Sequence, residues 1–101
     1  MDGTPTIIIT NSDISGNNTG GGGGGIRASS GSLSLSNSTI LDNSAAYAGG
    51  ILLETAATLS NCVITGNSST GSESGGGGIR CVNSQGDISI IHTTIADNIS
   101  N

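Results

Sequence analysis

Two arginines, Arg27 and Arg80, are the only Lys or Arg residues in the chain and the first candidates for chemistry. In the repeat described below they fall in one outward column two coils apart, with Leu52 between them and Glu54 two residues beyond Leu52. An arginine beside carboxylates that hold Ca²⁺ could take the proton α to the carboxyl group of a uronate. We expect instead a solvated arginine beside a surface acid, because such exposed pairs are common and weakly stabilising.

The other candidates are two cysteines, one histidine and two aspartates. Cys62 and Cys81 fall on inward positions, so we expect buried thiols that act as small hydrophobes, with a disulfide as the alternative if their Cβ atoms come within about 4.5 Å. Without a C-x-x-C motif or a second histidine, a zinc site is not supported. His92 replaces an asparagine in a repeated column, where we expect a hydrogen-bonded structural imidazole. Asp42 and Asp97 share a column two coils apart, too far to share one Ca²⁺.

An internal repeat of about 25 residues places all of these residues. Its unit reads G-G-I, about ten residues, then L-x-N-x-x-I-x-x-N and a loop of small residues. The first column, at intervals of 26, 24 and 31 residues, is Asn11, Asn37, Asn61 and His92. The second column, six residues further on, is Asn17, Asn43, Asn67 and Asn98. The third column, the Gly-Ile step, is Ile26, Ile51 and Ile79. Such a period without helical rhythm predicts stacked coils of strand.

Apolar residues alternate with small polar ones before each residue of the first column. The apolar pairs are Ile7 and Ile9, Leu33 and Leu35, Ala57 and Leu59, and Ile88 and Ile90. A period of two marks a strand with one buried face. The phase slips after the asparagine, so we expect a corner there, with asparagine in the left-handed backbone conformation. We expect the side chains of both asparagine columns to point inward and to hydrogen-bond along the stack as a ladder.

The sequence therefore predicts an all-β solenoid of about four coils, in which three short parallel sheets surround a narrow apolar core. At roughly 4.8 Å per coil, the rod would be on the order of 20 Å long. We expect one domain over residues 1–101, with coils at about 4–25, 26–50, 51–78 and 79–101. No capping element is recognisable before Thr6 or after Ile99, so we expect uncapped ends. Either the chain is a fragment of a longer solenoid or its ends meet another copy.

Composition restricts the function. Of the 101 residues, 9% are charged, and the formal net charge is −5 with no lysine. Nucleic acid is not an expected partner, because phosphate neutralisation needs clustered Lys or Arg. No run of 18 apolar residues is present to span a bilayer, and the first residues do not read as a signal peptide.

Two runs carry a family resemblance. Residues 40–43 read I-L-D-N and are followed by G-G-I at 49–51, and residues 64–67 read I-T-G-N and are followed by G-G-G-I at 76–79. These repeats resemble those of bacterial right-handed parallel β-helix surface proteins. They are also similar to the G-G-A-I and F-x-x-N repeats of chlamydial polymorphic outer-membrane proteins, with Ile in place of Phe. The resemblance implies a right-handed β-helix with the pectate-lyase-like superfamily fold, on the bacterial cell surface or outer membrane or secreted.

The resemblance leaves three functions to compare. The favoured one is a non-enzymatic adhesin or stalk segment, which needs no cofactor and whose partners would be cell-surface glycans or host or neighbouring proteins. The first alternative is a carbohydrate-active β-helix similar to pectate lyases, with Arg27, Glu54 and Arg80 as its surface candidates and Ca²⁺ as its cofactor. The second alternative is a solenoid that stacks end to end into rods or filaments.

Overall fold

A computed structural model describes residues 6–71, 76–82 and 87–100, and every regular element in these ranges is a β-strand. The strands form four sheets, in which all neighbouring strands are parallel. We name each sheet after its first strand. The β1 sheet contains β1 (Thr6–Thr10), β4 (Ser32–Ser36), β8 (Ala56–Ser60) and β12 (Ile88–Ile91). The β2 sheet contains β2 (Asp13–Ser15), β5 (Thr39–Leu41), β9 (Val63–Thr65) and β13 (Thr94–Ala96).

The two remaining sheets have three strands each. The β3 sheet contains β3 (Ile26–Ala28), β7 (Ile51–Leu53) and β11 (Ile79–Cys81). The β6 sheet contains β6 (Ser44–Ala45), β10 (Ser68–Ser69) and β14 (Ile99–Ser100).

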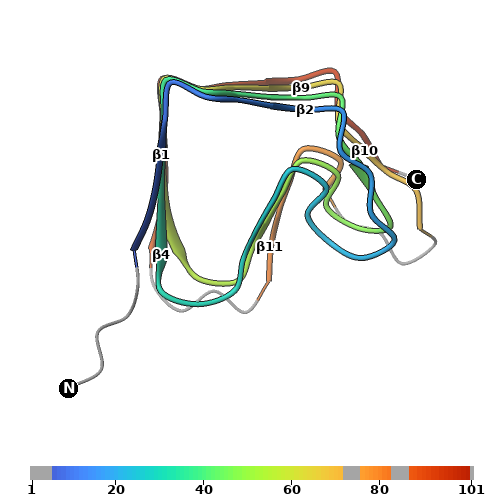
Figure 1. The fold of residues 1–101 in the computed structure, drawn as a ribbon, viewed down its shortest axis with the longest axis horizontal. Helices are drawn as coiled ribbons and strands as arrows, with labels where there is room; N and C mark the ends of the chain where they lie inside the picture. Colours follow the sequence, from blue (N-terminus) through green and yellow to red (C-terminus); the bar gives the residue numbers. More distant parts are fainter. Residues whose placement is uncertain (1–5, 72–75, 83–86, 101) are drawn as a thin grey trace.

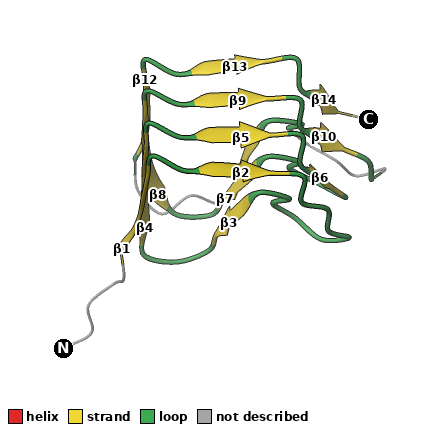
Figure 2. Ribbon diagram, turned by 45° about the horizontal axis from the view of Figure 1, so that its top comes forward, coloured by secondary structure: helices red, strands yellow, loops and turns green. Residues whose placement is uncertain are grey.

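Successive coils lie directly over one another. Viewed down the shortest axis of the molecule, β1 and β4 overlie each other on one side, β2 and β9 on the next, and β11 closes the third side (Figure 1). In the tilted view, β2, β5, β9 and β13 are four parallel layers (Figure 2). The molecule measures 40 × 26 × 19 Å. The shortest dimension lies along the stack and agrees with the length predicted for four coils.

The predicted columns are in register. Leu33 pairs with Ile7 and Ala57 in the β1 sheet. The Asn37 N–H donates to Ser60 O at 3.1 Å, which places Asn37 beside Asn61 in the next coil. The inward side chains of the β1, β2 and β3 sheets fill one apolar core. Its largest fully buried members are Leu33, Leu35, Ile40, Ile51, Leu53, Leu59 and Ile64.

The number of sheets differs from the prediction, which was three. Three sheets do enclose the core, but the β6 sheet lies beyond the second corner, where the chain leaves the core and makes a lateral loop (Figure 1). The loops also stack coil on coil, as the bridge between Asn18 and Ser44 shows. Backbone N–H and C=O groups need partners wherever they are shielded from water, so the stacking continues past the core into the loops.

The first corner, which follows β1, β4, β8 and β12, corrects one prediction. Its residues all have left-handed backbone, with φ of 52° at Asn11, 51° at Asn37, 53° at Asn61 and 47° at His92. This conformation agrees with the prediction, but the four side chains are exposed to solvent instead of pointing inward. The corner bends the chain around the core, so the side chain of the residue at the bend lies on the convex side. The first column is therefore not an internal ladder.

A second left-handed corner precedes the second asparagine column. Its residues are Gly16, Asp42, Gly66 and Asp97, with φ of 70°, 56°, 69° and 57°. Glycine and aspartate are among the few residues that tolerate this conformation, so the alternation of Gly and Asp in this column has a backbone cause. Both aspartates are exposed.

Candidate functional site

The second asparagine column forms a continuous hydrogen-bonded ladder. At each step, Oδ1 of one asparagine accepts two hydrogen bonds, from the backbone N–H and from the Nδ2 of the asparagine in the preceding coil, at 2.9–3.0 Å. Nδ2 also donates at 3.0 Å to an isoleucine carbonyl of the preceding coil. These pairs are Asn43 with Ile14, Asn67 with Ile40, and Asn98 with Ile64. Asn43 and Asn67 are fully buried, and their satisfied amides hold the coils in register.

A second polar column, of which only Cys62 was a candidate from the sequence, runs directly after the first corner. Its members are Ser12, Ser38, Cys62 and Thr93, and each donates to the carbonyl oxygen two residues earlier, at 2.8–3.2 Å. The Ser12 N–H donates in turn to Ser38 Oγ at 3.1 Å. The sequence signal was present, because every residue that follows the corner asparagine or histidine has a hydroxyl or a thiol.

The two cysteines differ in burial, which corrects the prediction of two buried thiols. Cys62 is 2% exposed, whereas Cys81 is exposed although it shares an inward column with Ala28 and Leu53. The reason is that β11 is the edge strand of its sheet. Both thiols are free, so the alternative of a disulfide is not realised. Partial desolvation raises the pKa of the Cys81 thiol.

Arg27 lies beside Glu54, as the sequence predicts. Arg27 Nε donates to Glu54 Oε1 at 3.3 Å, and Ser29 Oγ donates to the same oxygen at 3.0 Å. The side chains of Arg27 and Glu54 are 51% and 30% exposed. At this exposure the ion pair contributes little to stability.

Arg80 makes a contact that the sequence analysis did not include. Its guanidinium carbon lies 5.5 Å from the centroid of the Tyr47 ring, a cation–π geometry. Leu52, between the two arginines in the outward column, is only 2% exposed. The Tyr47 ring and Gly22 lie against it, since a Cβ atom at Gly22 would collide with the ring and lie 2.7 Å from Leu52 Cδ2. The available sequence signal was that Tyr47 is the only aromatic residue of the chain.

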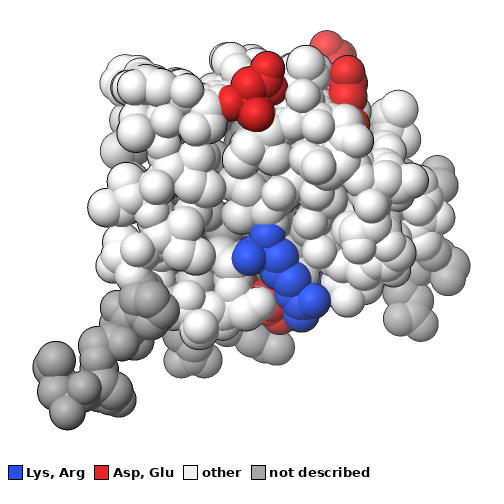
Figure 3. All heavy atoms as spheres, in the orientation of Figure 1, with Lys and Arg blue, Asp and Glu red and all other residues white. Residues whose placement is uncertain are grey.

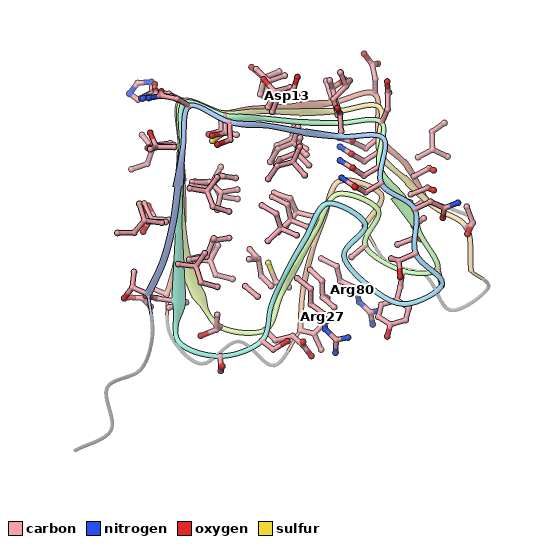
Figure 4. The ribbon with its side chains drawn as sticks, in the orientation of Figure 1. Asp13, Arg27 and Arg80 are labelled. Atoms are coloured by element: carbon pink, nitrogen blue, oxygen red, sulfur yellow. The ribbon has the colours of Figure 1, made fainter. Side chains whose placement is uncertain are left out.

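These residues form one surface feature, which we call the arginine patch: Arg27, Tyr47, Leu52, Glu54 and Arg80. Arg27 and Arg80 both point outward from the β3 sheet, two coils apart, with Leu52 between them in register (Figure 4). They form the single basic area in the space-filling view, while most of the acidic atoms in view lie apart from it (Figure 3). Over the described residues the surface is not hollowed into a pocket, and no group of three or more His, Cys, Asp or Glu is placed to hold a metal ion.

The outer face of the β1 sheet is a second, different surface. The positions that alternate with core residues there are mostly serine and threonine. In register order they are Thr6 and Ser32; Ser34, Thr58 and Ser89; and Thr10, Ser36 and Ser60. This hydroxyl face, which also includes Ile8, Ala56 and Ile91, has no charged side chain at these positions, so it can donate and accept hydrogen bonds without attracting or repelling charge.

The patch geometry limits the chemistry available to it. A guanidinium group keeps its proton in proteins, and Arg27 is in addition paired with a carboxylate. Both arginines therefore act as fixed positive charges with planar arrays of donors, which suit carboxylate, sulfate or phosphate groups. This donor geometry suits recognition of an anion.

Parallel strands stacked coil on coil around one core, with two polar columns running along the stack, define a β-solenoid. The match to a family model described as right handed beta helix region covers residues 1–99. The chain therefore belongs to this family, and its fold is an all-β right-handed parallel β-helix. No curated protein and no solved structure matches the chain. Within the described ranges, no helix is long and apolar enough to cross a membrane.

Proposed function

We propose that the chain is a non-enzymatic, adhesin-like segment of an extracellular or cell-surface β-helix protein, and that its arginine patch binds acidic glycans. One observation carries the proposal. In a chain with a net charge of −5, both basic side chains and the single aromatic side chain come together on one outer face. The repeat places the two arginines, and the lateral loop brings Tyr47 to Arg80.

The charge distribution favours an anionic ligand at this place. Arg27 keeps half of its side chain accessible while it contacts Glu54. The Arg80 guanidinium carbon lies 5.5 Å from the centroid of the Tyr47 ring, so an aromatic side chain accompanies this cation on the same face. Because the rest of the chain is acidic, an anionic glycan would be repelled elsewhere and attracted here.

The test is binding of the folded chain to immobilised glycans, comparing polyuronate and sulfated oligosaccharides with neutral ones. Each of Arg27→Ala and Arg80→Ala should weaken binding to the acidic glycans about tenfold or more, since charge-assisted hydrogen bonds contribute about 1.5–3 kcal/mol. Thr58→Ala, on the hydroxyl face, serves as the control and should bind acidic glycans like the parent chain. Equal binding of acidic and neutral glycans, or no effect of either arginine substitution, would count against the proposal.

The carbohydrate-active alternative is tested with the same samples. A lyase cleaving polyuronates with Ca²⁺ present would release unsaturated products that absorb in the ultraviolet. We expect none, because a lyase of this kind needs clustered carboxylates that hold Ca²⁺ beside the arginine, and the described residues bring no group of three or more such ligands together. Release of unsaturated products that is lost in the Arg80→Ala variant would replace our proposal with the enzymatic one.

A further inference from the structure

The core columns are open at the first and last coils. Ile7, Ile90 and Ile95 are 43%, 43% and 45% exposed. In the middle coils, the residues of the same columns are almost fully buried: Leu33, Leu59 and Ile64 are 2%, 0% and 0% exposed. Each end of the stack therefore presents an apolar surface shaped to receive another coil.

The asparagine ladder gives these two surfaces complementary hydrogen-bonding groups. At every internal step, the asparagine of the earlier coil supplies two donors to Oδ1 of the later asparagine. In the other direction, Nδ2 of the later asparagine donates to an isoleucine carbonyl of the earlier coil. Within the described residues, Asn17 Oδ1 has no donor from an earlier coil and the Asn98 N–H has no acceptor from a later one. The Asn17 side chain of the first coil and the Asn98 donors of the last coil therefore match the two halves of an internal step.

We propose that the 101-residue chain binds a second copy of itself head to tail, with the first coil of one copy seated on the last coil of the other. The Asn98 N–H and Nδ2 of one copy would donate to Asn17 Oδ1 of the next, as Asn67 donates to Asn98 within one copy. Contact between two first coils or two last coils would not reproduce the set of bonds that joins successive coils within one copy. In a longer chain an adjoining coil would occupy the same atoms, so we expect this self-association of the 101-residue chain by itself.

Backbone pairing supports the same direction. β12 and β13 are edge strands at the last coil, and β1 and β2 are edge strands at the first coil. Head-to-tail stacking would continue the β1 and β2 sheets in parallel register. The β6 sheet would also continue, because β14 of one copy would lie beside Asn18 of the next, the residue that bridges to Ser44 within one copy. The β3 sheet ends one coil earlier, at β11, and does not take part in the junction. Because each copy keeps one free end, the contact does not close and the product is a rod.

The first experiment measures the mass of the chain by sedimentation velocity at rising concentration. We expect the monomer of 9.7 kDa to give way to a series of multiples and then to rods visible by electron microscopy. A chain that remains monomeric at every concentration, or that stops at a closed dimer, would overturn the proposal. Glycan binding at the arginine patch is a separate measurement, so either proposal can fail without the other.

Two lysine substitutions test the direction of stacking. Ile7→Lys should block the first coil and Ile90→Lys the last, so that each variant alone is monomeric. When the two variants are mixed in equal amounts, the open last coil of the Ile7→Lys chain should bind the open first coil of the Ile90→Lys chain. The mass should then double and increase no further. A mixture that stays monomeric would overturn the head-to-tail arrangement.

Neighbouring isoleucines on the same strands provide matched controls. Ile8 and Ile91 face outward and are 71% and 45% exposed, so lysine there lies beside the junction and not in it. Both control variants should assemble like the parent chain, and circular dichroism should show the same strand content for all four variants. If Ile91→Lys blocks assembly as fully as Ile90→Lys, the apolar end surface is not the binding surface.

Discussion

Asn43 and Asn67 lie 24 residues apart in sequence and are joined through a single oxygen atom. The Asn43 backbone N–H and its side-chain Nδ2 both donate to Asn67 Oδ1, at 2.9 and 3.0 Å. Both residues are fully buried. The contact therefore connects backbone and side chain of one coil to the side chain of the next, and it fixes how the coils are stacked.

Asn67→Asp should destabilise the fold strongly. The substitution replaces the Nδ2 donor to Ile40 O and to Asn98 Oδ1 with an oxygen. Ile40 O then loses this donor, Asn98 Oδ1 keeps only the Asn67 N–H, and a buried carboxyl is added. We expect a loss of about 3 kcal/mol or more in the free energy of unfolding, measured by urea denaturation. The matched control is Asn61→Asp, whose side chain is exposed at a left-handed corner. It should change stability by no more than about 0.5 kcal/mol, and equal losses would contradict the assignment of the inward ladder to the second column.

His92→Gly should stabilise the chain. His92 has φ of 47°, a left-handed conformation that costs a residue with a Cβ atom roughly 1–2 kcal/mol and that glycine adopts without this cost. Glycine also has a larger conformational entropy in the unfolded state, which offsets part of the gain. We expect a net gain of about 0.5–1 kcal/mol in thermal or urea unfolding. Thr94→Gly, two residues later within β13, should lose about 0.5–1 kcal/mol. A loss at His92 as large as that at Thr94 would show that the imidazole stabilises the corner.

Gly22→Ala should displace Tyr47 from Leu52. A Cβ atom at Gly22 would collide with the Tyr47 ring, whereas one at Gly21 would meet only Thr19 Oγ1 at 3.9 Å. Tyr47 is the single aromatic residue, so the near-ultraviolet circular dichroism of the chain reports on its surroundings alone. We expect this signal to fall sharply in Gly22→Ala and to persist in Gly21→Ala. Similar spectra for the two variants would mean that the lateral loop can accommodate the methyl group.

The two thiols should react at very different rates with a thiol reagent. Cys81 is exposed and should be labelled in the folded chain, although desolvation raises its pKa and so lowers its thiolate fraction at pH 8. Its labelling should therefore be slower than that of an unfolded cysteine and should speed up as the pH rises. Cys62 is buried and should be labelled only after unfolding. The Cys81→Ser variant has no fast-reacting thiol, so it shows which labelling phase belongs to Cys81. Labelling of Cys62 in the folded chain as fast as that of Cys81 would contradict the burial of Cys62.

Much of the architecture could be predicted because it depends on local patterns. The alternation around Leu33 and Leu35 specifies a strand with one buried face, and the phase slip after Asn37 specifies the bend there. The pairing of Arg27 with Glu54 follows from the same register. By contrast, Tyr47 comes from a loop whose path depends on Gly22 and Leu52, so its contact with Arg80 could not be obtained from the repeat.

The amino-acid sequence by itself determined the period, the columns and the parallel stacking, because a residue spacing of two and a repeat of about 25 residues are properties of the chain order alone. Only the tertiary structure decided which asparagine column points into the molecule. Both columns hold the same residue type, and the direction of each side chain depends on the sense of the bend at the corner. The tertiary structure also decided the exposure of Cys81, because burial of an inward residue requires a further strand over it, and β11 is the edge of its sheet.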